Sequence, residues 1–468
     1  MDYTIYSLLT DVMWASILIG AAMLIRRFIK FFQDMFVPVS LLAGFLGLIL
    51  GNNGFQIIKF SDQFGTYSGM LIIVVFVTVG LRGFTISKKT LKNDVQRVGR
   101  FFAFRNIGFF AQYSLPILLG IFVLSKLAPG LNPAFGMLMP AGWQGGHGTA
   151  AALGATLEKL GWGDATDLAM TSATIGILTG IFAGIILIKI ATKKGYTRYI
   201  EDVNSLPEEQ RVGLIQPANR PPMGEETVAP GALDPFAWHL ALVLIPSGIG
   251  YLITDYLGTQ HNISVPGFSV GFLVAVLFGF LLRKTNIDKY VDKKVVSRIG
   301  GTATDFLVFF GVASIRVPVV IDYALPFGIL MLFAIAWTVF HAVFIGPRLM
   351  KEDWFEKSVY VFGYSSGVVA IGLSLLRICD PENKSTCLDD TAICTPIETV
   401  IEIIFLAVAP GVYVSGNWLG LMGITLACLA ALIILPIFFG WWHPKKEVVN
   451  AEYTGFQKKI GKTIDITE

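Results

Sequence analysis

Charged residues are scarce in this chain. Of its 468 residues only 15% are Asp, Glu, Lys or Arg, whereas 54% are hydrophobic. A soluble protein carries charge at about a quarter of its positions, so the composition excludes a soluble globular domain. The 49 glycines agree with this, because glycine is more frequent in membrane helices than in soluble ones. The composition therefore predicts an integral membrane protein with many spans.

Catalytic motifs and a framework of cysteines are missing as well. The chain has no HExxH, no P-loop lysine and no recognisable Ser/His spacing, which argues against an intramembrane enzyme. It has four cysteines, and the spacing of Cys379, Cys387 and Cys394 matches no zinc pattern. We interpret their segment as a polar loop with reduced thiols, as is usual in the cytosol. A disulfide or a weak metal clip is the alternative.

Apolar stretches long enough to cross a bilayer, about 20 residues each, follow one another along the chain. No basic region precedes the first of them, so we interpret it as a span rather than as a cleaved signal peptide. Lysines and arginines gather in every second loop, and cytoplasmic loops hold such residues in excess. The N-terminus is therefore predicted to lie outside. The predicted spans are 7–25, 36–51, 68–83, 101–127, 168–190, 236–257, 265–282, 302–321, 326–349 and 397–414, with 419–439 as a further candidate.

The first set of five spans begins outside and ends inside, and the second set begins inside. The two sets therefore have opposite orientations, which is a necessary feature of an inverted repeat. The two repeats are predicted at 1–192 and 236–440. Weak internal similarity supports them, since VPVSLLAGFLGLILG from Val37 resembles VPGFSVGFLVAVLFG from Val265. GWQGGHGTAAAL and GYSSGVVAIGL form a second such pair, in the same order and at a similar offset.

Two segments outside the spans are polar. Residues 193–235 are rich in proline and charge, and they are predicted to form a poorly ordered cytoplasmic linker between the repeats. Residues 441–468 carry several lysines and are predicted to form a cytoplasmic tail. A cytoplasmic tail requires 419–439 to be an eleventh span.

Two further apolar stretches, near 134–157 and 360–378, are broken by glycine, serine and proline and do not suit single helices. By the count of spans, each enters and leaves on one side of the membrane. We interpret each as a re-entrant hairpin of two half-helices, with the two tips meeting near the midplane. Irregular backbone at that depth is tolerated where it is buried in protein or lines a cavity. Close helix packing through small residues is the alternative.

The free backbone groups of such tips would serve as ligands. Half-helix N-termini direct partial positive charge at anions, and the second tip adds hydroxyls, so a carboxylate is the expected substrate group. Carbonyls of the same loops could coordinate Na⁺. For His147, a buried and hydrogen-bonded structural role is the alternative to a ligand or proton relay. The predicted substrate-binding residues here are Gly145, Gly146, His147, Gly148, Thr149, Tyr364, Ser365, Ser366 and Gly367.

Ionisable residues within spans are functional candidates. Arg316 is predicted to bind a substrate carboxylate, the alternatives being a pair with Asp305 or Asp322, or a side chain that reaches to the outer interface. Asp305 precedes Arg316 by eleven positions, about three helical turns, so we expect the two to share a face. Asp305, Gln144 and Asn106 are the candidate Na⁺ ligands. For Asp305 a place near the inner headgroups is the alternative, and for Asn106 a helix-to-helix hydrogen bond.

The strings GGHGTAAA, GLNPAFG and GYSSG, together with the Val-Pro start of the second span, resemble the sodium/glutamate symporter family. The resemblance implies a secondary active transporter that couples Na⁺ to uptake of L-glutamate across the bacterial cytoplasmic membrane. It also implies a homodimer in which a core moves against a scaffold as an elevator. No cofactor is expected besides Na⁺ as the coupling ion.

The chain departs from the family pattern at its second hairpin tip, which is not glycine-rich, at the cysteine-containing insertion and at the additional C-terminal span. Two other functions stay open at this point. One is a di- or hydroxycarboxylate transporter coupled to Na⁺ or H⁺. The other is a membrane receptor or channel that does not transport substrate.

Overall fold

The protein folds into helices joined by turns and loops. Its computed structural model describes residues 4–34, 37–82, 95–200, 212–261, 265, 267–380 and 384–443. Ten helical segments in these ranges are long and apolar enough to cross a membrane, which confirms a multi-spanning membrane protein. They are Ile5–Phe28, Phe64–Arg82, Val95–Leu127, Ala165–Lys193, Pro235–His261, Gly267–Lys284, Lys293–Ala313, Ala324–Leu349, Ile397–Val414 and Trp418–Phe438. A shorter apolar helix, α3 (Val39–Leu50), matches the second predicted span.

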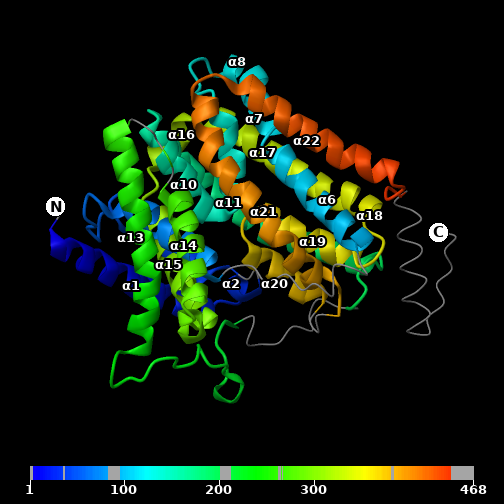
Figure 1. Ribbon diagram of the computed structural model, residues 1–468. Helices are drawn as coiled ribbons and strands as arrows, with labels where there is room; N and C mark the ends of the chain where they lie inside the picture. The colour runs from blue at the N-terminus through cyan, green and yellow to red at the C-terminus, as the bar shows by residue number, and fades with distance from the viewer. Residues whose placement is uncertain are drawn as a thin grey trace.

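The helices pack in two groups. In the first, which we call the α4 group, α3 packs against α1 and α15, and α4 packs against α14 and α15. Its members are α1 (Ile5–Phe28), α3, α4 (Tyr67–Arg82), α13 (Pro235–His261), α14 (Gly267–Lys284) and α15 (Lys293–Ala313). In Figure 1, α1, α13, α14 and α15 lie together on the left.

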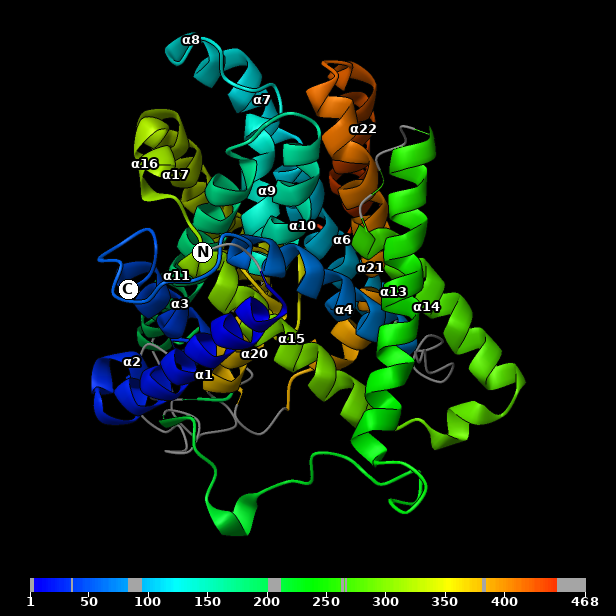
Figure 2. The ribbon, with the colours of Figure 1, turned by 90° about the vertical axis from the view of Figure 1, so that its left-hand side faces the viewer.

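The second group surrounds α11 (Ala165–Lys193), and we call it the α11 group. Helix α11 packs against α9, α10, α19 and α20, while α6 packs against α21 and α22. The other members are α6 (Val95–Gln112), α9 (Leu138–Trp143), α10 (Gly146–Lys159), α17 (Ala324–Phe340), α19 (Trp354–Ser365), α20 (Val369–Cys379), α21 (Cys387–Val414) and α22 (Trp418–Phe438). Helix α10 also packs against α4 and α15, so it lies where the two groups meet, near the centre of Figure 2.

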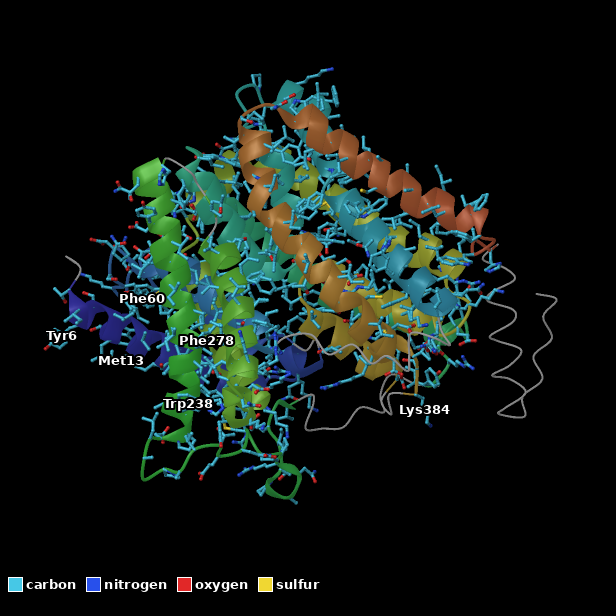
Figure 3. The ribbon with its side chains drawn as sticks, viewed as in Figure 1. Tyr6, Met13, Phe60, Trp238, Phe278 and Lys384 are labelled. Carbon is cyan, nitrogen blue, oxygen red and sulfur yellow. The ribbon has the colours of Figure 1, made fainter. Side chains whose placement is uncertain are left out.

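Helix α1 shows how the apolar sequence divides between protein and lipid. Its small residues Ala15 and Ala22 are fully buried in the core that α1 shares with α3 and α15. Tyr6 and Met13 are exposed and point away from the bundle in Figure 3. Small side chains let helix backbones approach, and a bilayer covers the large apolar ones that remain outside.

Among the residues that the structure describes, each half of the chain contains one π-helical turn, at Gly120–Leu124 and at His341–Ile345. The first follows a break at Ser114, where Pro116 has no N–H to continue the preceding helix. Each π-helical turn lies a similar distance before a helix–turn–helix unit, α9–α10 in the first half and α19–α20 in the second. Such turns are rare and are frequent at functional sites.

The predicted span 302–321 is wrong at its end. Helix α15 stops at Ala313, and Arg316 precedes a separate short helix, α16 (Val317–Asp322). Pro318 cannot donate a hydrogen bond to the Ser314 carbonyl, and that carbonyl instead accepts from the Asn53 side chain at 3.0 Å. Asp305 and Arg316 therefore do not share a helix face.

The cysteine segment is also different from its prediction as a polar loop. Cys379 ends α20, and Cys387 begins the long helix α21, which includes Cys394. All three thiols are buried and none forms a disulfide. The connection between α20 and α21 is held in part by Asp380, whose carboxylate accepts hydrogen bonds from the backbone of Lys384 and Ser385, each at 2.7 Å.

Of the predicted linker the structure describes residues 193–200 and 212–235, and of the predicted tail it describes residues 441–443. The linker runs along the ends of α13 and α15 and contains one short 3-10 turn, Pro217–Asn219 (Figure 2). Thr227 donates to the Tyr290 carbonyl at 2.7 Å, and the Glu225 amide donates to Asp292 at 2.5 Å. Residues 201–211 and 444–468 lie outside the described ranges.

Candidate functional site

The first hairpin consists of α9 and α10, preceded by a 3-10 turn at Phe135–Met137. Only Gln144 and Gly145 separate the two helices, and α10 begins at Gly146. Pro140 does not interrupt α9, because it lies in the first turn, where no helical N–H is needed.

The second hairpin consists of α19 and α20, joined by Ser366, Gly367 and Val368. Helix α19 begins at Trp354, before the predicted start of the hairpin near 360, and α20 begins at Val369. Glycines let the two arms approach. A Cβ on Gly363 would lie 2.8 Å from the Gly372 Cα, and a Cβ on Gly372 would lie 2.5 Å from the Tyr360 carbonyl.

The two hairpin tips touch each other. Gly146 has a left-handed φ of +61°, and a Cβ there would lie 2.5 Å from Cγ1 of Val368 and 3.4 Å from the Gly367 carbonyl. Neither the N-terminus of α10 nor that of α20 is capped by a side chain at its N-cap residue, Gly145 or Val368. The first amides of both helices therefore lack their usual side-chain acceptors, and the positive ends of two helix dipoles converge.

A row of glycines on α11 positions the second hairpin, and the sequence interpretation missed it. A Cβ on Gly176, Gly180 or Gly184 would lie 2.5 to 2.6 Å from Ser366 or Leu375 of the second hairpin. The three glycines are four positions apart and share one helix face. They let the second hairpin approach α11 closely, as small residues do between membrane helices. The signal in the sequence is the spacing TIGILTGIFAG.

Several polar groups around the tips are buried without a partner among the described residues. His147 is fully buried, and its Nε2 lies 3.0 Å from Oγ1 of Thr174, but its Nδ1 has no partner. Gln112 donates from Nε2 to the Ser365 carbonyl at 2.9 Å, whereas its Oε1 is unpaired. Nε2 of Gln144 is unpaired as well. Buried polar groups are normally satisfied, so these atoms suit a bound ligand or water.

A charged cluster lies beside the tips. Arg105 of α6 is buried, and its guanidinium binds Oε2 of Glu398 at 2.7 Å and lies 4.6 Å from the Tyr364 ring centre. The Asn106 side chain donates to Oε1 of Glu398 at 3.1 Å. Oε1 of Glu402, one helical turn further along α21, lies 3.4 Å from where a Cβ on Gly145 would be. Arg105, Glu398 and Glu402 were missed, although an ionisable residue in an apolar run is a signal that the sequence contains.

The structure brings most of the predicted site residues together. The residues from Gly145 to Thr149 and from Tyr364 to Gly367 lie at or next to the two touching tips. Gly148 faces the α4 group, since a Cβ there would lie 3.1 Å from Cδ1 of Ile72. The Ser366 hydroxyl donates to the Phe362 carbonyl of the preceding helix, α19, at 2.7 Å.

Arg316 and Asp305 are not at the tips. Arg316 binds Asp167 at the start of α11, with its Nη2 2.6 Å from Oδ2, and half of its side chain is exposed. Its partner is therefore neither Asp305 nor Asp322. Asp167 lies roughly 13 Å along α11 from Gly176, which contacts the second tip. Asp305 interacts with the Ser40 side chain of α3.

We expect Arg316→Ala to leave the affinity for L-glutamate, the substrate that the resemblance implies, close to that of the wild type. The lost contacts join a half-exposed guanidinium to Asp167 and Asp164, and such pairs contribute on the order of 1 kcal/mol or less to stability. Titration of glutamate into both proteins in saturating Na⁺ measures the dissociation constants. A weakening of tenfold or more would place Arg316 in the substrate site.

Comparison with known proteins identifies the family of this chain. The model of the sodium/glutamate symporter family matches residues 4–373. Two curated sodium/glutamate symporters, from Escherichia coli (strain K12) and Shigella flexneri, are each 24% identical over 239 residues. The match spans 50% of this chain and 56% of each relative, so it covers little more than half of their length. The chain belongs to the sodium/glutamate symporter family, a family of transporters and not of enzymes.

Proposed function

We propose that the protein imports L-glutamate, or a similar anionic amino acid, together with Na⁺ across the bacterial cytoplasmic membrane. The observation that carries the proposal is the convergence of two uncapped helix N-termini where Gly146 meets Gly367 and Val368. Membership of the sodium/glutamate symporter family supports it.

Glutamate has two carboxylates, and the site offers two positive helix ends. One carboxylate would accept hydrogen bonds from the first amides of α10, and the other from those of α20. The unpaired Nε2 of Gln144 is a further donor at the first tip. The residues from Gly145 to Thr149 and from Ser365 to Gly367 are the proposed substrate contacts.

Sodium ions would be bound mainly by oxygen atoms of the tip backbone. Among the described residues, no group of three or more His, Cys, Asp or Glu side chains could hold a metal ion. Backbone carbonyls and the Gln144 side chain are therefore the proposed ligands. Asn106 hydrogen-bonds to Glu398, so it is a weaker candidate, and Asp305 lies elsewhere.

Transport is proposed to occur by an elevator movement of the α11 group, which holds both hairpins, against the α4 group. Each half of the chain contributes its first three apolar helices to the α4 group and its later helices and hairpin to the α11 group. This division is what an inverted repeat over 1–192 and 236–440 would produce. The same proposal includes an N-terminus outside the membrane, a cytoplasmic linker at 193–235, a cytoplasmic tail at 441–468 and a homodimer.

The test is uptake of labelled L-glutamate into proteoliposomes with and without an inward Na⁺ gradient. We expect accumulation that depends on the gradient and ceases when a sodium ionophore dissipates it. Equal uptake in K⁺ would rule out sodium coupling. Uptake of a dicarboxylate in place of L-glutamate would favour the carboxylate carrier instead.

A further inference from the structure

Among the described residues, the Glu402 carboxylate beside the first hairpin tip has no hydrogen-bond partner, although it interacts electrostatically with Arg105. Its Oε1 lies 3.4 Å from where a Cβ on Gly145, the N-cap residue of α10, would be. Within the described ranges, this carboxylate forms no hydrogen bond or ion pair. Tyr113 and Tyr364 are electrostatic neighbours of Glu402 and form a polar surrounding for it.

The nearby arginine, Arg105, already forms an ion pair with a different carboxylate, that of Glu398. Arg105 binds Glu398 at 2.7 Å, and Glu398 also accepts a hydrogen bond from Asn106. This cluster therefore contains one cation, Arg105, and two carboxylates, Glu398 and Glu402. Glu402 is the carboxylate that lies beside the tip. A negative charge at such a site is unfavourable unless a cation accompanies it.

An α-amino acid supplies a cation in the required place. Its ammonium nitrogen and its carboxylate carbon are joined to one carbon atom and lie about 2.5 Å apart. A site that binds both groups must therefore place an anionic acceptor directly beside its amide donors. Glu402 and the first amides of α10 are adjacent in this way, with Gly145 between them.

We propose that Glu402 binds the α-ammonium group of the substrate and so selects an amino acid over the corresponding dicarboxylate. This rests on the proposed function, because it assumes that the hairpin tips bind the substrate carboxylates. Glutarate has the same two carboxylates as L-glutamate but no ammonium group. It would leave the Glu402 carboxylate unpaired and facing a dianion, and sites discriminate strongly when a buried polar group loses its partner.

The experiment is calorimetric titration of L-glutamate and of glutarate into the purified full-length protein in saturating Na⁺. The wild type should bind L-glutamate more tightly than glutarate. Glu402→Gln should weaken L-glutamate binding by about 10- to 100-fold, as for loss of a charged hydrogen bond. The same variant should bind glutarate as tightly as the wild type or more tightly. Retained glutarate binding also shows that the variant is folded.

Asp389→Asn is the matched control, because Asp389 is an exposed carboxylate in the first turn of the same helix. It should bind both ligands as the wild type does. Glu402→Asp keeps the charge on a shorter side chain and should lower the preference for L-glutamate without abolishing it. It replaces Glu402→Gln if that variant does not purify as a single species.

Two results would overturn the assignment while leaving the proposed function intact. One is an unchanged preference for L-glutamate in Glu402→Gln. The other is an equal loss of both ligands, with a steeper requirement for Na⁺, which would make Glu402 a sodium ligand. A wild type that binds neither compound would instead contradict the proposed function itself.

Discussion

Gly146→Val should abolish sodium-driven uptake of L-glutamate while the protein still inserts into the membrane and purifies as a single species. Gly146 has φ +61°, where a β-branched residue is strongly disfavoured. The first carbon of the new side chain would also lie 2.5 Å from Cγ1 of Val368. The substitution would therefore separate the two tips and displace the first amides of α10. Uptake into proteoliposomes, measured at equal protein content, checks this.

Gly328→Val is the matched control for that experiment. Gly328 lies in α17, and a Cβ there would have no neighbour within 4 Å among the described residues. The control should transport at close to the wild-type rate, since valine in a membrane helix has no contact to disturb at this position. Full activity in Gly146→Val would mean that the contact between the tips is packing without a role in transport.

The second large effect is expected at Arg105. Arg105→Met would leave Glu398 buried without its cation, and breaking a buried ion pair on one side costs about 3 to 5 kcal/mol. We expect a marked fall in the thermal unfolding temperature of the purified protein and loss of L-glutamate binding. The double variant Arg105→Met with Glu398→Met removes both charges at similar volume, and it should recover most of the stability.

The double variant separates two roles of the pair. Recovered stability without recovered binding would show that Arg105 orients Tyr364 and the second hairpin in addition to neutralising Glu398, since its guanidinium lies 4.6 Å from the Tyr364 ring centre. If the double variant is as unstable as Arg105→Met alone, the Arg105–Glu398 pair is not what stabilises this region. Circular dichroism during heating is a suitable measurement for both variants.

The spans were predictable because the signal for them is local. A run of about 20 apolar residues suffices to cross the bilayer whatever lies elsewhere in the chain. Glycine and proline likewise mark both hairpins in the sequence. What the sequence does not show is where contacts from distant segments end or begin a helix. Helix α15 ends where Asn53 supplies its side chain to the Ser314 carbonyl, and Asn53 is 261 positions away.

The same limit explains the start of α21 and part of the site. Asp390, in the first turn of α21, binds Lys357 and Arg97, each at 2.9 Å, and both partners come from other helices. The segment containing the cysteines is helical partly because these contacts satisfy its charge. The contact between the tips and the pairing of Arg316 with Asp167 depend on tertiary packing in the same way. Arg105 differs from these cases, because an arginine within an apolar run rich in phenylalanine can be recognised as a candidate site residue from the sequence alone.

The hydrogen bond from Gln112 to the Ser365 carbonyl has a consequence for how the protein is made. The two residues are 253 positions apart in the chain. At a synthesis rate of about 5 to 20 residues per second, roughly 12 to 50 seconds pass between the synthesis of Gln112 and that of Ser365, and the first hairpin is complete for most of that interval. Until Ser365 is made, Gln112 and the amides at the tip of the first hairpin lack their contacts with the second hairpin. Water at the membrane surface or the insertion machinery has to accommodate the first hairpin until the second one arrives.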